Sequence, residues 1–202
     1  MAVTKKFSAA HIREAYENGL REFGENYVQE FAEKRADVAD LKDARFHLIG
    51  HLQSNKARLA CDLFQVVETI DSVKLLQRLD ASAKERNISV EALLEVKLSP
   101  EESKSGAGPE EIPELLESAQ HCSHVTVSGL MTMPPWSEDP ERSRCYFQRL
   151  AELGRRHKLQ QLSMGMSGDL EVAIEEGATI VRVGTALFGP RPKIQKEAIP
   201  TF

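Results

Sequence analysis

Cysteine is scarce in this sequence, and its three copies lie far apart at positions 61, 122 and 145. Because they are odd in number and form no CxxC pair, they exclude a disulfide framework and a zinc knuckle, and we expect reduced, mostly buried thiols. No apolar run approaches the roughly 18 residues that a membrane span needs. Residues 1–30 also lack the apolar stretch of a signal peptide. We therefore expect a cytoplasmic protein with no membrane partner.

Positive charge is also in short supply. The 26 lysines and arginines are outnumbered by 31 acidic residues, which gives a formal net charge of −5. A surface of this kind does not attract polyanions, so we expect no nucleic-acid partner. A length of 202 residues is enough for one well-buried core and short for two. We expect a monomer with a single folded domain.

Short β-branched runs alternate with amphipathic stretches along the chain, a pattern typical of α/β proteins. Eight strands are predicted, at Ala2 to Lys5, Leu20 to Phe23, Phe46 to Ile49, Phe64 to Glu68, Val90 to Leu98, Val125 to Met131, Gln161 to Met164 and Thr179 to Val183. Seven helical segments lie between them, near residues 8–18, 25–40, 54–60, 71–86, 109–120, 139–157 and 169–176. So many strands in a chain of this length favour a single (β/α)8 TIM barrel over an open doubly wound sheet.

The two ends of this pattern are irregular. The first predicted strand begins at Ala2, and the segment from Pro190 to Phe202 contains three prolines and no helical period. We therefore expect a barrel over residues 1–189 and a C-terminal tail over residues 190–202. The ring of helices is expected to lack one N-terminal helix. Either that helix has been removed, or one seam between helices stays uncovered.

Two loops that follow the seventh and eighth predicted strands contain glycine next to a hydroxyl. Phosphate groups typically bind (β/α)8 barrels at these two loops. Ser167 and Gly168 lie in the first loop, and Gly184 and Thr185 in the second. Glycine lets the backbone approach a phosphate closely, and the hydroxyl adds a hydrogen bond. Two ordinary turns remain the alternative interpretation.

Arg182 lies in the last predicted strand, where side chains alternate between two faces. If Val181 and Val183 pack beneath helices, Arg182 enters the barrel, where a guanidinium group needs partners and is a candidate site residue. An outward-facing or purely structural arginine is the alternative. Lys5 ends the first predicted strand on the same face as Val3, which would place its amine in the barrel mouth. Position alone also fits a solvated terminal lysine.

Two pairs of histidines suggest a metal site, but their settings oppose it. His47 and His51 are four residues apart, yet they straddle a strand end and Gly50 instead of sharing one helix face. His121 and His124 precede the sixth predicted strand and belong to the opposite end of the barrel. We predict no metal, and we expect the loop that carries His51 to lie at the barrel mouth.

Seven segments spread over almost the whole chain resemble a known family. They are Ala2-Val3-Thr4-Lys5, Phe23 to Glu30 (FGENYVQE), His47 to Lys56 (HLIGHLQSNK), Ser103-Lys104-Ser105-Gly106, Gly129-Leu130-Met131, Leu162 to Leu170, and Val181 to Gly189 (VRVGTALFG). In these segments the chain resembles the pyridoxal phosphate homeostasis proteins of the YggS/PROSC type, whose barrel is similar to the N-terminal domain of alanine racemase. The family usually carries a further helix before the lysine strand, and this chain departs from it there.

The resemblance implies that the cofactor is pyridoxal phosphate and that Lys5 holds it as a Schiff base. It also implies that Ser167, and Gly184 with Thr185, bind the cofactor phosphate. The position of the two loops had pointed to a phosphate site without the family, whereas the identity of the cofactor comes from the resemblance alone.

The resemblance further places Arg182 beside the pyridine nitrogen and lines the pocket with Asn26 and with the loop that carries His51. The implied function is a binding protein without turnover, which takes part in intracellular pyridoxal phosphate homeostasis and in amino-acid and keto-acid balance. Apo-enzymes that require pyridoxal phosphate would be its protein partners, and a scaffold that signals cofactor state is compatible with this role.

The alternative function is that of a pyridoxal phosphate-dependent amino-acid racemase. Racemisation needs proton transfer on both faces of the substrate, so a second base must face Lys5 across the cofactor ring. In alanine racemase a second domain supplies that base, and this chain ends where such a domain would begin. A permanent cation at Arg182 would also weaken the ring as an electron sink. Both points favour the carrier.

Overall fold

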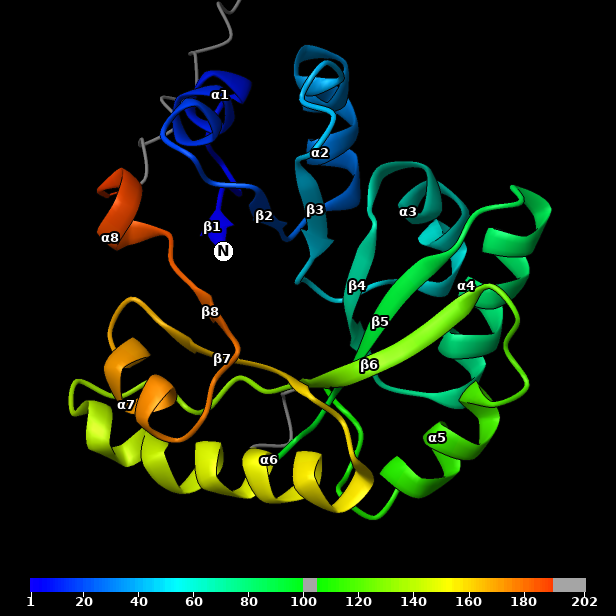
Figure 1. Cartoon of the computed structure of the whole chain (residues 1–202), viewed down its shortest axis with the longest axis vertical. Coiled ribbons are helices and arrows are strands. Elements are labelled where there is room, and N and C mark those ends of the chain that lie inside the picture. The colour runs from blue at the N-terminus through cyan, green and yellow to red at the C-terminus, as the bar shows by residue number, and fades with distance from the viewer. Residues whose placement is uncertain (100–104, 191–202) are drawn as a thin grey trace, which may run out of the picture.

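The strands of this protein form one parallel sheet that follows the order of the chain. The computed structural model describes residues 1–99 and 105–190. The strands are β1 (Ala2–Val3), β2 (Glu22–Glu25), β3 (Arg45–Leu48), β4 (Val66–Ile70), β5 (Val90–Glu95), β6 (Val125–Met131), β7 (Gln161–Met166) and β8 (Ile180–Arg182). Val3 N–H donates to Val183 O at 2.8 Å, and Val183 N–H donates to Met1 O at 3.0 Å. The first and last strands therefore meet, and the predicted (β/α)8 barrel is confirmed (Figure 1).

Helices surround the strands, and all seven predicted helical segments are present. The α-helices are α1 (Ala9–Glu17), α2 (Val28–Arg35), α3 (Ala57–Leu63), α4 (Val73–Glu85), α5 (Ile112–Ala119), α6 (Arg144–His157), α7 (Leu170–Glu175) and α8 (Thr185–Phe188). Three 3-10 turns, at Ala36–Val38, Ser54–Lys56 and Pro140–Ser143, extend α2, α3 and α6. Helix α8 was not predicted, because one turn is too short to show a helical period.

Helix α8 lies where the last strand meets the first. Its Phe188 ring packs against Phe7 and His11, with centroid separations of 5.1 and 6.0 Å. These contacts cover part of the gap between helices that was expected from the missing N-terminal helix. The predicted tail over residues 190–202 lies, apart from Pro190, outside the described residues.

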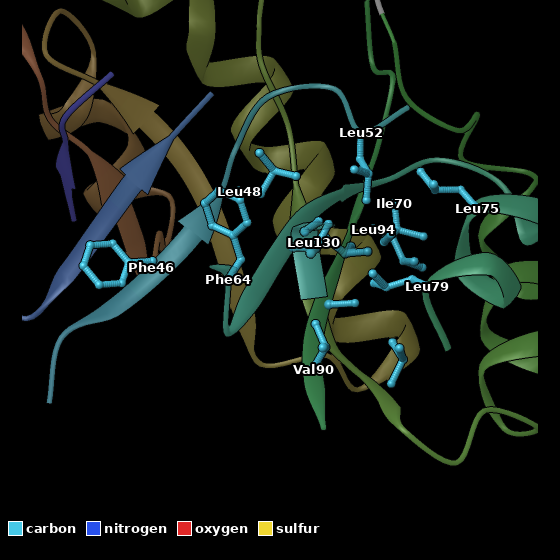
Figure 2. Packing of buried hydrophobic residues seen from close by; sticks show 14 of the residues in the cluster. Phe46, Leu48, Leu52, Phe64, Ile70, Leu75, Leu79, Val90, Leu94 and Leu130 are labelled. Carbon is cyan, nitrogen blue, oxygen red and sulfur yellow. The ribbon is translucent and has the colours of Figure 1, made fainter. Parts of the chain in front are cut away.

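The main hydrophobic core fills the space between the strands and the helices. Alternation along β3 turns Phe46 toward the helices, where the Phe31 ring of α2 lies 4.6 Å from it. Farther around the barrel, Figure 2 shows Leu79 of α4 packed with Ile70 of β4 and Leu94 of β5. Full burial of one such side chain contributes about 1.5–3 kcal/mol. The helices are therefore held on the sheet by ordinary apolar packing.

The interior of the barrel is different, because much of it is polar. Its apolar part is a small separate cluster of Val66, Leu93 and Met131. Buried polar side chains that contact one another across the barrel come from β3, β4, β7 and β8, and they are His47, Glu68, Ser163 and Arg182. Strands buried on both faces usually read as continuous apolar runs, so these four residues stand out.

The three cysteines differ in how far they are exposed. All three cysteines have free thiols; Cys61 is buried, Cys122 is half-buried and Cys145 is exposed. The prediction of mostly buried thiols is therefore wrong for Cys145. Within the described part of the chain, no helix is both long and apolar enough to cross a membrane.

Candidate functional site

A cavity of about 350 Å³ lies at the carboxyl ends of the strands, the edge where (β/α)8 barrels place their sites. Its wall combines segments from both ends of the chain, since residues that follow β1 and β2 meet residues from β7 and β8. Six of the seven site residues predicted from sequence line this cavity: Lys5, Asn26, Ser167, Arg182, Gly184 and Thr185. The structure thus brings together groups that lie up to 180 positions apart.

Lys5 lies in a tight turn directly after β1. Phe7 N–H donates to Thr4 O at 3.1 Å and closes a four-residue turn. Lys6, the third residue of this turn, has a φ of +64°. This is the left-handed region, which residues other than glycine rarely adopt. The prediction that the strand continues to Lys5 is wrong, because β1 ends at Val3 and the turn begins at Thr4, whose N–H makes the last bond to β2. Lys5 itself is half-buried and lines the cavity.

Arg182 points into the barrel, as alternation along β8 predicted, and it is only 4% exposed. Its guanidinium donates to Ser163 Oγ at 2.8 Å and to the carbonyl of Thr132 at 2.8 Å. Burial lowers the pKa of Arg182, and the negative charges of Glu68, Asp169 and Glu95 oppose this shift. The side chain is therefore held rigidly at the base of the cavity.

Behind Arg182, a row of hydrogen bonds crosses the barrel. Ser163 Oγ donates to Glu68 Oε2 at 2.5 Å, and Glu68 Oε1 lies 2.7 Å from His47 Nδ1. The other ring nitrogen, Nε2, lies 2.5 Å from Glu22 Oε2. Two carboxylates thus alternate with two cationic side chains, which offsets the cost of burying the Arg182 charge.

The charges in this row shift one another's pKa values. Burial alone would lower the pKa of His47, but its hydrogen bonds to Glu22 and Glu68 outweigh burial and raise it. The hydrogen bond to His47 also lowers the pKa of Glu22, although partial burial opposes this. These shifts favour a protonated His47 imidazolium beside an ionised Glu22 carboxylate. Ser163 and Glu68 were not among the predicted site residues, because their only signal in the sequence was a polar residue within an apolar strand.

Asn26 follows β2, and its backbone lies against the loop after β3. A Cβ added to Gly50 would come within 2.2 Å of Asn26 O, so only glycine permits this approach. Among the described residues, the buried Oδ1 of Asn26 has no hydrogen-bond partner. An unsatisfied buried acceptor costs about 1–3 kcal/mol. Since Asn26 lines the cavity, a donor on a bound molecule could satisfy it.

His51 is placed differently from the other predicted site residues. Its side chain is 56% exposed, and its Nδ1 lies 3.8 Å from Asp71 Oδ2. The same loop reaches the cavity through Ile49, and His51 is absent from the lining. The reason is that β3 ends at Leu48, beyond which strand alternation no longer fixes the direction of side chains. His47 and His51 therefore do not share a site.

One wall of the cavity consists of apolar side chains that were not among the predicted site residues. Met133 and Trp136 follow β6, and Met166 ends β7. They are unusually exposed for their type, at 38%, 80% and 37%. Their signal in the sequence was their position directly after a predicted strand, at the edge of the barrel where the site was expected. They give the cavity an apolar side suited to a flat ring.

Comparison with known proteins shows the family. The model of the alanine racemase N-terminal domain matches residues 1–192. A pyridoxal phosphate homeostasis protein of Aquifex aeolicus is 46% identical over 188 residues, which cover 89% of this chain and 81% of the relative. The chain belongs to the pyridoxal phosphate homeostasis protein family. The resemblance seen in the sequence is confirmed.

Solved structures agree with this assignment. PipY of Synechococcus elongatus was solved with PLP bound. It is 42% identical to this chain and has a TM-score of 0.86, and the match covers 94% of this chain and 91% of PipY. Alanine racemase of Clostridium difficile is only 13% identical, with a TM-score of 0.75, and the match covers 96% of this chain and 52% of the racemase. The second likeness shows the fold alone.

Proposed function

We propose that this chain binds pyridoxal phosphate as a Schiff base on Lys5 and holds it reversibly, as a carrier in pyridoxal phosphate homeostasis. The observation that carries the proposal is one cavity lined by Lys5, by Arg182 and by the loops of Ser167 and Thr185. An amine, a buried cation and two loops with hydroxyls suit the aldehyde, the ring nitrogen and the phosphate of that cofactor. PipY, which is 42% identical, was solved with PLP bound, and this supports the choice of cofactor.

The two loops after β7 and β8 fit a phosphate group. Ser167 Oγ accepts a hydrogen bond from Ala186 N–H at 3.4 Å, which links the loops to each other. Gly168, Gly184 and Thr185 complete this side of the cavity. Hydroxyls and backbone N–H groups are the usual ligands of a phosphate outside metal sites, and charge strengthens each bond. We assign the cofactor phosphate to these loops.

Arg182 suits the ring nitrogen of the cofactor. When bound, the cofactor supplies an electrophilic aldehyde and an electron-withdrawing ring. A guanidinium group only donates hydrogen bonds, so next to the ring nitrogen it opposes protonation there. Because Ser163 and Thr132 fix Arg182 in place, this donor cannot move away. The ring is then a weak electron sink, which favours a carrier without turnover.

A racemase would need a second base in the same cavity. Among the described lining residues, Asp169 is the only carboxylate, and both of its oxygens are engaged. Its Oδ2 accepts from Ser143 Oγ at 2.8 Å and its Oδ1 from Met166 N–H at 2.7 Å. Loss of one general base costs about 100- to 10,000-fold in rate. In deuterated water, holo-protein should therefore form no D-alanine from L-alanine at enzymatic rates; steady formation would favour the racemase.

The direct test is an absorbance spectrum of the protein with pyridoxal phosphate, followed by borohydride reduction and peptide mapping. We expect an imine band that reduction fixes on Lys5. Lys5→Ala should abolish the band and leave weak binding, because the phosphate contacts are separate from the aldehyde. A reducible imine in that variant would show that another lysine, such as Lys6 or Lys56, is the true site.

The phosphate assignment has its own test. Pyridoxal, which lacks the phosphate, should bind more weakly than pyridoxal phosphate by about 2–4 kcal/mol, because charge-assisted hydrogen bonds are lost. Ser167→Ala and Thr185→Val should each remove part of that difference. Calorimetric titration measures the affinities of both ligands in the wild-type protein and in the two variants. Equal affinity of the wild-type protein for pyridoxal and pyridoxal phosphate would refute the phosphate assignment.

The wider role extends the same proposal. We propose that residues 1–189 form the binding domain, that the protein works as a monomer in the cytoplasm, and that apo-enzymes requiring pyridoxal phosphate take up the cofactor. Reversible storage of a reactive aldehyde would in turn influence amino-acid and keto-acid balance. Transfer from loaded protein to an apo-enzyme, followed by recovery of that enzyme's activity, measures this step; transfer no faster than release into solution would contradict it.

A further inference from the structure

The turn that carries Lys5 is held from one side by the Lys34 side chain of α2. Lys34 Nζ donates to Thr4 O at 3.2 Å and to Phe7 O at 3.1 Å. These are the carbonyls of the first and last residues of the turn. One ammonium group therefore fixes both ends of the four-residue segment in which Lys5 is the second residue.

Two carboxylates complete the support of this turn. Glu25 Oε1 accepts from Lys34 Nζ at 2.7 Å and from Thr4 Oγ1 at 2.8 Å. Glu30 Oε1 accepts from Lys34 Nζ at 3.0 Å and from the Lys6 backbone N–H at 2.6 Å. The last bond holds Lys6 in its unfavourable left-handed conformation. Each residue on either side of Lys5 is thus bonded to this group of three charged side chains.

The burial of these charges suggests a purpose other than stability. The side chains of Lys34, Glu25 and Glu30 are 12%, 0% and 27% exposed. Burial raises the pKa of Glu25 even though Lys34 opposes the shift, which shows how costly the site is for a carboxylate. Buried ion pairs are often no more stabilising than apolar residues of the same size, and their clearest benefit is a fixed geometry.

We propose that Lys34, together with Glu25 and Glu30, is a positioning group that holds the Lys5 turn in the geometry needed for imine formation. The inference rests on the proposed function, in which Lys5 is the residue that reacts with the aldehyde. Within the described part of the chain, no hydrogen bond joins this group to the phosphate loops after β7 and β8, so its loss should affect the aldehyde reaction and leave phosphate binding intact.

The test compares two ligands on one variant. Pyridoxine phosphate carries an alcohol in place of the aldehyde and binds without forming an imine. In Lys34→Met, affinity for pyridoxal phosphate should fall by at least about tenfold, because small errors in placing a reacting group are costly. Affinity for pyridoxine phosphate should change less than about twofold. Lys84→Met, which removes an exposed lysine of α4, is the matched control and should leave both affinities unchanged.

A second variant guards against a folding defect, since Lys34→Met leaves the buried Glu25 without its ammonium partner. Glu30→Ala removes the acceptor of Lys6 N–H and keeps the Lys34–Glu25 pair. It should lower affinity for pyridoxal phosphate about fivefold and spare pyridoxine phosphate, since one hydrogen bond contributes about 1 kcal/mol. Equal losses for both ligands, or no loss for either, would overturn the positioning role.

Amide hydrogen exchange of the apo-protein tests the same role without any cofactor. The amides of Lys6 and Phe7 should exchange at least about tenfold faster in Glu30→Ala, while those of β3 keep their protection. Unchanged exchange would contradict the inference. If wild-type protein formed no imine on Lys5 while exchange rose as expected, the proposed function would fail and the support of the turn would stand.

Discussion

Toward the helices, the strands present aromatic and aliphatic side chains that join one continuous core, whereas toward the barrel axis they present a row of ionisable groups. Phe46 and His47 are neighbours on β3 and belong to these two different regions. The outer region needs only the right volume of apolar atoms, and many sequences can supply it. The inner region needs specific partners at hydrogen-bond distance. Residues that face inward therefore carry the information about function.

Substitution in the outer core should have the largest effect on stability. Phe46→Ala removes a fully buried ring that stacks on Phe23 at 5.6 Å and packs at a tilt against Phe31 at 4.6 Å. We expect the free energy of unfolding to fall by about 3–5 kcal/mol in urea titrations. Affinity for pyridoxal phosphate, measured where the variant is still folded, should not change. A selective loss of affinity would mean that the two regions are coupled.

A smaller loss of stability with a clear loss of binding is expected for the inner row. Glu68→Gln removes the negative charge between His47 and Ser163, and we expect the free energy of unfolding to fall by about 1–3 kcal/mol. Because Ser163 holds Arg182, pyridoxal phosphate should also bind more weakly. Glu91→Gln is the matched control, since Glu91 pairs with Arg45 and Gln161 away from Arg182. If Glu68→Gln and Glu91→Gln weakened binding equally, the row that ends at Arg182 would have no special role in binding.

The pH dependence of stability should come from the inner row as well. The hydrogen bonds to Glu22 and Glu68 raise the pKa of His47 in the folded protein despite its burial. Such a group stabilises the fold fully below its unfolded value of about 6.5, and this contribution is lost as pH rises through the folded-state pKa. Unfolding measured between about pH 5 and pH 9 should show this loss in wild type and not in His47→Gln. If the free energy of unfolding changed with pH in the same way in both proteins, His47 would not be the group responsible.

The smallest effect is expected at the outer surface. Arg13 of α1 pairs with Asp40 at 2.6 Å, but the two side chains are 41% and 64% exposed. Arg13→Gln should change the free energy of unfolding only slightly and leave cofactor binding unaltered, because solvent screens an exposed ion pair. Salt titration gives a further check, since screening should remove most of even this difference. A large effect would show that the surface contributes more than solvent exposure allows.

Most of the fold could be predicted because the chain repeats one pattern. All eight strands and seven helical segments follow from the alternation of β-branched runs with amphipathic stretches, and only α8 is too short to show a period. The two glycine loops could be located without the family because barrel strands place their ends together. The direction of Arg182 also follows from alternation within a single strand.

What the sequence could not predict depends on closure of the barrel. Glu68 and Ser163 lie on β4 and β7, and nothing in either strand alone indicates that they meet across the interior. The turn at Lys5 was missed because lysine seldom adopts the positive φ of Lys6. His51 was assigned to the pocket by its loop, yet only Ile49 of that loop reaches the lining. Such errors occur where the chain has left regular secondary structure.

The pairing of Val3 with Val183 has a consequence for the time at which the site forms. Contacts between residues so far apart in sequence close a long loop, and topologies rich in such contacts fold slowly. Lys5 follows the first strand of the barrel and Arg182 lies in the last, so the proposed cofactor site is complete only when that last strand has joined the sheet.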